Sequence, residues 1–173
     1  MTGARTFAGT LLLGAMLAGC ASAPSGAAAA NRGAATSGPA LEAKMVALPF
    51  RLDVTFTPAA LARLSALEAR VKVSADYYGP PKAAGSARVD PDLGVWLGGE
   101  TFAIEPGARS LTFKGRIDAA QVARDVEGDA RVRVSAVSEG GVDPAAVVCA
   151  AFDEYLPIAV ETGGTVHCAA AGE

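Results

Sequence analysis

Alternation of apolar and polar residues dominates the chain after about residue 44. In residues 50–57, FRLDVTFT, every second side chain is apolar. The same period of two recurs in 70–78, 111–117 and 132–136, and residues 146–152 form a more continuous apolar run. Because successive side chains of a strand point to opposite faces of a sheet, this period predicts a series of short, half-buried strands.

Turn and cap residues divide these strands. Gly163-Gly164 lies between two further apolar segments, 157–162 and 165–169, and predicts a two-residue hairpin. Thr57 followed by Pro58 is typical of a helix start, with leucines at helical spacing behind it. Asp118 predicts the cap of a second short helix.

The strand pattern predicts an all-β domain over residues 45–173. We expect an antiparallel β-sandwich, immunoglobulin-like or transthyretin-like, of about seven or eight strands with one or two short helices. No internal repeat is visible.

The first 44 residues follow a different pattern. Residues 1–19 contain Arg5 and then a short apolar run, which falls well short of the about 20 apolar residues that a membrane-spanning helix needs. This arrangement is typical of a secretory signal peptide that is removed. Residues 20–44 begin with a cysteine and are rich in Ala, Gly, Ser and Pro, which predicts a flexible tether.

The end of the apolar run, Leu17-Ala18-Gly19-Cys20, resembles the lipobox of bacterial lipoproteins. The resemblance implies cleavage before Cys20 and a covalent lipid on its sulfur. Because residue 21 is Ala rather than Asp, it also implies sorting to the periplasmic side of the outer membrane. In an organism with a single membrane, the location becomes the outer face of the cytoplasmic membrane. The lipid would supply the membrane attachment.

With Cys20 assigned to the lipid, Cys149 and Cys168 remain as a pair. In an oxidising compartment such a pair is expected to form a disulfide. The bridge could lie within one sheet or join two sheets. By analogy with immunoglobulin-like domains, Trp96 is a candidate to pack over it.

Charge and motifs exclude several functions. The chain has 15 Lys and Arg against 18 Asp and Glu, a net charge of −3, which argues against nucleic acid as the partner. Metal-binding motifs are absent from the sequence, and we expect no cofactor apart from the lipid on Cys20. The single histidine, His167, has no nucleophile motif around it. Carboxylate pairs such as Glu100 and Glu105 are the remaining candidates for hydrolysis.

Two segments have the character of a binding surface. In the first, Tyr78 precedes Pro80 and Pro81, and strand alternation places Tyr77 in the core and Tyr78 on the surface. In the second, Tyr155 lies in an acidic and aromatic stretch after Cys149.

These observations predict a non-catalytic role in binding or assembly. The expected partner is another envelope protein or a cell-wall component. One alternative is an inhibitor of, or an accessory to, a periplasmic cell-wall hydrolase. A second alternative is an envelope hydrolase that uses loop carboxylates.

Overall fold

Strands make up most of the computed structural model, which describes residues 43–82, 89–139 and 146–173. The predicted signal peptide, Cys20 and all but the last two residues of the predicted tether (20–44) lie outside the described residues. The described part contains eleven strands and three helices. In chain order these are β1 (Met45–Ala47), β2 (Phe50–Phe56), α1 (Pro58–Ala66), β3 (Arg70–Gly79), β4 (Val89–Asp90), β5 (Gly94–Ile104), β6 (Arg109–Phe113), β7 (Arg116–Asp118), α2 (Ala119–Asp125), β8 (Arg131–Glu139), β9 (Val147–Cys149), β10 (Phe152–Tyr155), α3 (Leu156–Thr162) and β11 (Gly164–Ala170).

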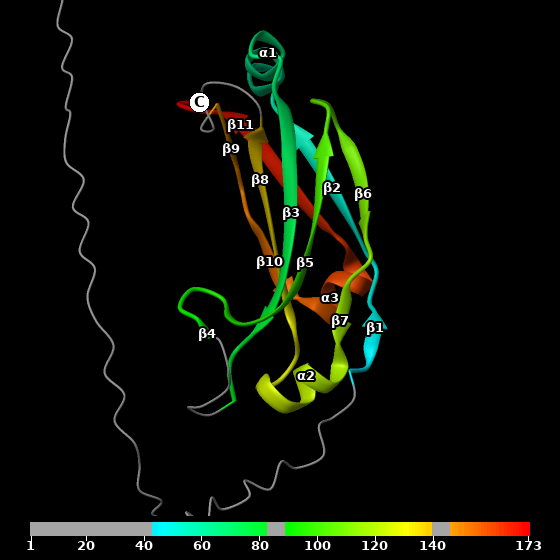
Figure 1. Cartoon of the computed structure of the whole chain (residues 1–173). Coiled ribbons are helices and arrows are strands. Elements are labelled where there is room, and N and C mark those ends of the chain that lie inside the picture. Colours follow the sequence, from blue (N-terminus) through cyan, green and yellow to red (C-terminus); the bar gives the residue numbers. More distant parts are fainter. Residues whose placement is uncertain (1–42, 83–88, 140–145) are drawn as a thin grey trace, which may run out of the picture. The chain divides into compact units, whose positions relative to one another are not determined.

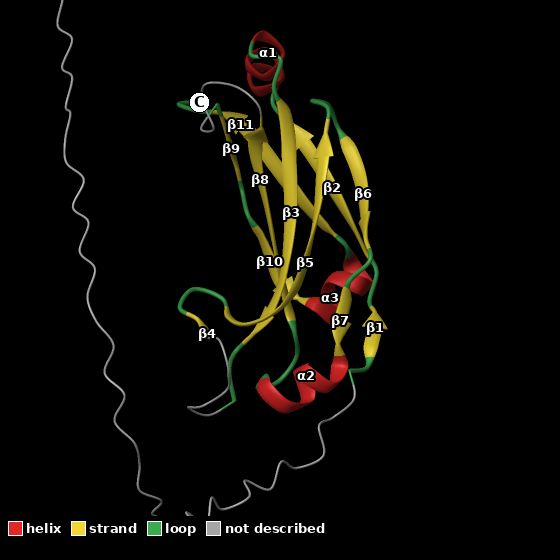
Figure 2. Cartoon of the chain, viewed as in Figure 1, coloured by secondary structure: helices red, strands yellow, loops and turns green. Residues whose placement is uncertain are grey.

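Two sheets face each other and confirm the predicted all-β sandwich (Figures 1 and 2). One sheet has five strands in the order β10-β8-β3-β5-β4, and the other has four in the order β6-β2-β11-β9. Strands β1 and β7 form a separate antiparallel pair. The structure has more strands than the seven or eight expected, because short segments such as β1, β4 and β7 lack a readable alternation.

The apolar positions of the alternating strands form the core between the sheets. On β3, the side chains of Val71, Val73, Ala75 and Tyr77 are each 1% exposed or less. Phe113 of β6 contacts Phe102 of β5 edge to face, with ring centroids 5.0 Å apart, so aromatic packing joins one sheet to the other. Burial of one such large apolar side chain contributes about 1.5–3 kcal/mol.

The helix starts also follow the sequence. The Thr57 hydroxyl accepts a hydrogen bond from the Ala60 N–H at 3.1 Å and caps α1, with Pro58 in its first turn. Asp118 caps α2 by accepting from the Ala120 N–H at 2.9 Å. Both predicted helices are therefore confirmed.

The predicted hairpin at Gly163-Gly164 is wrong. Residues 156–162 form α3, in which Pro157 occupies the first turn and Leu156 and Ala159 are buried. Gly163 ends the helix with φ +68°, and a Cβ there would lie 2.9 Å from the Arg51 carbonyl oxygen. Because α3 intervenes, β11 does not return beside residues 157–162. It pairs with β2 in parallel, so the sandwich is not wholly antiparallel.

The disulfide between Cys149 and Cys168 is present, and it lies within the four-stranded sheet. The two cysteines are direct partners on the antiparallel strands β9 and β11, with Cα atoms 4.0 Å apart. Trp96 is in β5 of the other sheet and is 55% exposed, so the expectation that it packs over the bridge is wrong.

Candidate functional site

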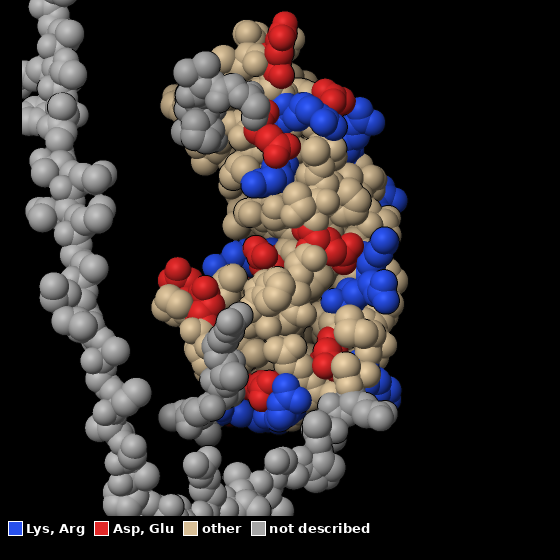
Figure 3. All heavy atoms as spheres, in the orientation of Figure 1, with Lys and Arg blue, Asp and Glu red and all other residues tan. Residues whose placement is uncertain are grey.

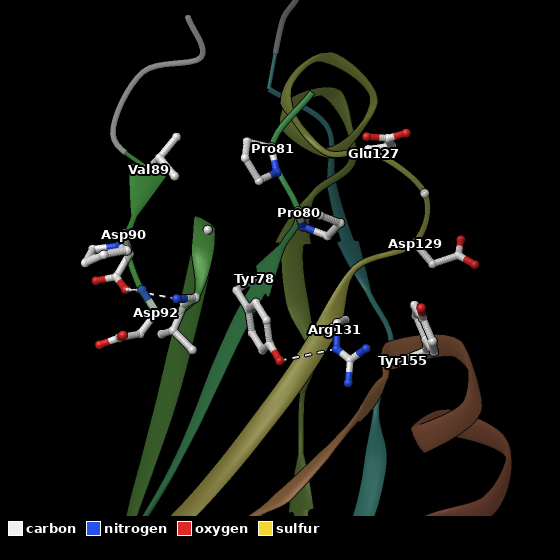
Figure 4. Close-up of a pocket in the computed structure, with 14 residues that line it drawn as sticks. Tyr78, Pro80, Pro81, Val89, Asp90, Asp92, Glu127, Asp129, Arg131 and Tyr155 are labelled. Atoms are coloured by element: carbon white, nitrogen blue, oxygen red, sulfur yellow. Dashed lines mark hydrogen bonds between the residues drawn. The ribbon is translucent and has the colours of Figure 1, made fainter. Parts of the chain in front are cut away.

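An open cavity of about 540 Å³ lies at one end of the five-stranded sheet (Figure 4). Its floor comes from the ends of β3, β8 and β10. One side is formed by residues 89–94, the β4 arm, which projects from the body of the domain in Figure 1. The other side is formed by residues 126–130, the loop between α2 and β8, which we call the facing loop.

The four residues that the sequence singled out for binding all line this cavity. Tyr78 is near the end of β3, Pro80 and Pro81 follow that strand, and Tyr155 is the last residue of β10. In the sequence, Tyr78 and Tyr155 lie in two separate segments, 77 positions apart (155 − 78). Strand β8 brings them together, because Arg131 pairs with Tyr78 on one side and with Tyr155 on the other.

Tyr78 is buried rather than exposed, with 6% of its surface accessible, which corrects the prediction for this side chain. Its hydroxyl donates to the Asp153 carboxylate, with the oxygen 2.6 Å from Oδ1 and 2.8 Å from Oδ2. The Arg133 guanidinium lies over its ring, 5.5 Å from the centroid. Alternation correctly places Tyr78 opposite Tyr77, but side chains from β8 and β10 then cover it.

Asp153 binds two arginines as well as Tyr78. Arg131 Nη2 lies 2.8 Å from Oδ1, and Arg133 Nη2 lies 2.9 Å from Oδ2. Burial acts to raise the pKa of Asp153, but hydrogen bonds from Tyr78, Arg131 and Arg133 outweigh it and hold the pKa below its usual value. Burial and the bond to Asp153 raise the pKa of Tyr78. The cluster therefore holds a charged carboxylate and a neutral phenol.

Arg131 also contacts Tyr155, with its guanidinium carbon 4.7 Å from the ring centroid. Tyr155 remains 43% exposed at the cavity. The floor of the cavity therefore contains an accessible aromatic side chain, Tyr155, which packs against Arg131. Arg131 is itself ion-paired with Asp153.

Backbone hydrogen bonds fix the proline side of the cavity. Glu127 N–H donates to the Pro80 carbonyl at 2.8 Å, and Lys82 N–H donates to the Asp125 carbonyl at 2.8 Å. Gly79 allows this approach, because a Cβ at that position would overlap the Val126 side chain. This part of the wall is thus formed before any ligand arrives.

Carboxylates stand on both sides of the cavity. Asp90 and Asp92 are on the β4 arm, where acidic side chains gather in Figure 3, and Glu127 and Asp129 are on the facing loop. Asp90 Oδ1 accepts from the N–H groups of Asp92 and Leu93 at 2.8 and 3.0 Å, which shapes the turn of the arm. Residues 90–92, Asp-Pro-Asp, have the composition of a polar turn, and nothing in the sequence connects them with residues 127–129.

The candidate catalytic residues are dispersed. His167 is exposed on β11, where its Nδ1 lies 2.9 Å from the Thr55 hydroxyl oxygen. Glu100 accepts from the Tyr77 hydroxyl at 2.8 Å and from the N–H groups of Lys114 and Gly115. Glu105 pairs with Arg70 at 2.9 Å. None of these three residues lines the cavity.

Two absences apply only to the residues that the structure describes. Among them, no group of three or more His, Cys, Asp or Glu side chains is arranged to hold a metal ion. No helix in the same residues is long and apolar enough to cross a membrane.

The fold and the cavity define an all-β sandwich domain with a disulfide and an open, aromatic and acidic cavity at one end. Comparisons of the chain with protein-family models, with curated proteins and with solved structures find no match. The case for a function therefore rests on the sequence and on the geometry of this domain.

Proposed function

We propose that the chain is a lipid-anchored envelope protein whose β-sandwich binds a partner through the cavity between the β4 arm and the facing loop. The observation that carries the proposal is the convergence of Tyr78, Pro80, Pro81 and Tyr155 on one cavity with a preformed wall. Exposed aromatic side chains on rigid supports bind partners at a low entropic cost.

The anchor is proposed from the sequence alone. Leu17-Ala18-Gly19-Cys20 at the end of a short apolar run supports lipidation of Cys20 and export to the periplasmic side of the outer membrane. The Cys149–Cys168 disulfide suits an oxidising compartment. A tether of residues 20–44 would span about 25–30 Å as a flexible coil, enough for the domain to reach a partner away from the lipid headgroups.

Binding is favoured over catalysis because the candidate catalytic carboxylates are already bound by other groups of the protein. Hydrolysis of a glycosidic bond needs two carboxyl groups that flank the same bond. Glu100 and Glu105 are instead occupied by a tyrosine, backbone N–H groups and an arginine. We therefore propose that the protein acts without a cofactor and without chemistry of its own.

The anchor is tested by Cys20→Ala. The variant should no longer label with palmitate and should leave the membrane fraction, while the unchanged chain labels and sediments with membranes. Palmitate labelling of the variant would refute lipidation at Cys20.

The binding role is tested by Tyr155→Ala in the full, membrane-anchored chain. Trp96→Ala is the matched control, because Trp96 is also an exposed aromatic residue of the five-stranded sheet but does not line the cavity. Partners recovered by chemical cross-linking should be lost in Tyr155→Ala and retained in Trp96→Ala. Equal recovery from both variants would show that the cavity is not the binding site.

A further inference from the structure

We propose that the occupant of the cavity is a basic segment of a partner protein, whose Lys or Arg side chains enter between the β4 arm and the facing loop. This inference rests on the proposed binding role and specifies the chemistry of the partner. It is carried by the net negative charge of the cavity lining, by the way the one lining arginine is held, and by the apolar surfaces beside the charges.

The lining carries four carboxylates, Asp90, Asp92, Glu127 and Asp129, against one guanidinium, Arg131, for a formal charge of −3. All four acidic residues are exposed. Within the described part of the chain, the carboxylates of Asp92, Glu127 and Asp129 have no side-chain or backbone partner. Three of these carboxylates thus have no counterion among the residues that the structure describes.

The single lining arginine offsets at most one of the four negative charges. Asp153 lies behind it, 2.8 Å from Arg131 Nη2, and this carboxylate is also paired with Arg133. The Arg131 guanidinium stacks on the Tyr155 ring. A ligand at the opening therefore meets four carboxylates at the rim and one arginine that is already held by Asp153 and by the Tyr155 ring.

The arrangement suits an extended cation better than a metal ion. In Figure 4, Asp90 and Asp92 lie on one side of Tyr78, and Glu127 and Asp129 lie on the other side. Among the described residues these acids do not form a cluster that could coordinate one metal ion. Charges spread along two facing walls match a segment that carries several positive side chains.

The surfaces between the carboxylates match the rest of a Lys or Arg side chain. Pro80 and Pro81 lie between the two acidic sides, and Tyr155 lines the cavity on the same side as Asp129. The methylene stem of a lysine or arginine packs on such apolar groups while its charged end reaches a carboxylate. An uncharged cell-wall glycan would use the tyrosine but would leave the three free carboxylates without partners.

The test uses the full-length protein and two dye-labelled peptides, one of alternating lysine and glycine and one of alternating glutamate and glycine. Fluorescence anisotropy should show binding of the lysine peptide only. Its affinity should fall as the ionic strength rises from about 0.05 to about 0.5 M, because the Debye length shortens over this range.

A variant with Asp92→Asn, Glu127→Gln and Asp129→Asn should bind the lysine peptide at least about tenfold more weakly. The matched control carries Glu68→Gln, Glu139→Gln and Glu161→Gln, three exposed acids outside the cavity, and removes the same net charge. Its affinity should stay within about twofold of the unchanged protein. Equal weakening in both variants would show that only the net charge matters and would overturn the proposal.

Two other outcomes would also overturn it. One is binding of soluble cell-wall glycan fragments, independent of salt, without binding of the lysine peptide. The other is failure of the lysine peptide to bind under all conditions. If either occurs while Tyr155→Ala still loses the cross-linked partner, the cavity remains the binding site and only its occupant is wrong. If Tyr155→Ala retains the partner, the proposed function itself fails.

Discussion

Two adjacent tyrosines, Tyr77 and Tyr78, are buried on opposite faces of β3, and a carboxylate binds each hydroxyl. Tyr77 faces the core and donates to Glu100 at 2.8 Å, whereas Tyr78 faces the outer side and donates to Asp153. Alternation along β3 predicts the direction of each ring. The cover over Tyr78 was not predictable, because Arg131 and Asp153 are distant in sequence and reach it only through strand pairing.

The buried phenols predict a loss of stability at alkaline pH. Burial raises the pKa of Tyr77, and the hydrogen bond to Glu100 raises it further. A raised pKa in the folded state contributes stability that is complete below the unfolded value of about 10 and is lost as the pH rises above it. The free energy of unfolding should therefore fall by up to about 1.4 kcal/mol per pH unit above about pH 10 for this residue.

Tyr77→Phe should reduce the rate at which the free energy of unfolding falls with pH above about pH 10. Glu100 keeps its two backbone N–H donors in the variant, so the fold should persist. Urea unfolding of both proteins at about pH 9 and about pH 11 measures the difference. Identical slopes would contradict the assignment of a protonated, buried Tyr77.

The lowered pKa of Asp153 predicts a loss of stability at acid pH. Its folded pKa is lowered, so its contribution is complete above the unfolded value of about 3.9 and is lost as the pH falls below it. Asp153→Asn should cost about 1–3 kcal/mol at pH 7, because Arg131 and Arg133 lose their common partner. The variant should also lose less stability than the unchanged protein between about pH 5 and about pH 3. A free energy of unfolding at pH 7 equal to that of the unchanged protein would contradict this account of the cluster.

At the scale of elements, the C-terminal segment shows where local sequence signals mislead. Gly163-Gly164 has the composition of a hairpin turn, but Gly163 ends a helix that begins at Leu156 and has Pro157 in its first turn. Residues 156–162 form too short a segment for the spacing of their apolar residues to distinguish a strand from a helix. The choice depends on tertiary structure. Helix α3 connects β10 of one sheet to β11 of the other sheet, where β11 pairs in parallel with β2.

The disulfide matters because β9 is an edge strand of only three residues. Cys149 and Cys168 are 19 positions apart, and closing a loop of this size stabilises a fold by about 3 kcal/mol on the chain-entropy model. Replacing both cysteines by alanine should lower the free energy of unfolding by about this amount. Urea unfolding with and without reductant checks the prediction, and the double variant serves as the control that no longer responds to reductant. An unchanged midpoint on reduction would contradict it.

At the scale of the whole molecule, the class of fold was predictable and the cavity was not. Alternating segments such as 50–57 predict a β-sandwich. The aromatic and proline residues Tyr78, Pro80, Pro81 and Tyr155 could also be identified as binding candidates from the sequence. Their meeting at one end of the sheet follows from the strand order β10-β8-β3, which no local signal encodes. The same holds for the carboxylates of the β4 arm and the facing loop.

The central claim, that this cavity binds a partner of the proposed lipoprotein, is tested most directly by site-specific photo-cross-linking. A photo-reactive phenylalanine analogue is placed at position 155 or at position 96 of the full chain in membranes. The account predicts a discrete cross-linked product from position 155 that the lysine peptide suppresses, and no such product from position 96. Cross-linking at both positions alike, or at position 96 alone, would contradict it.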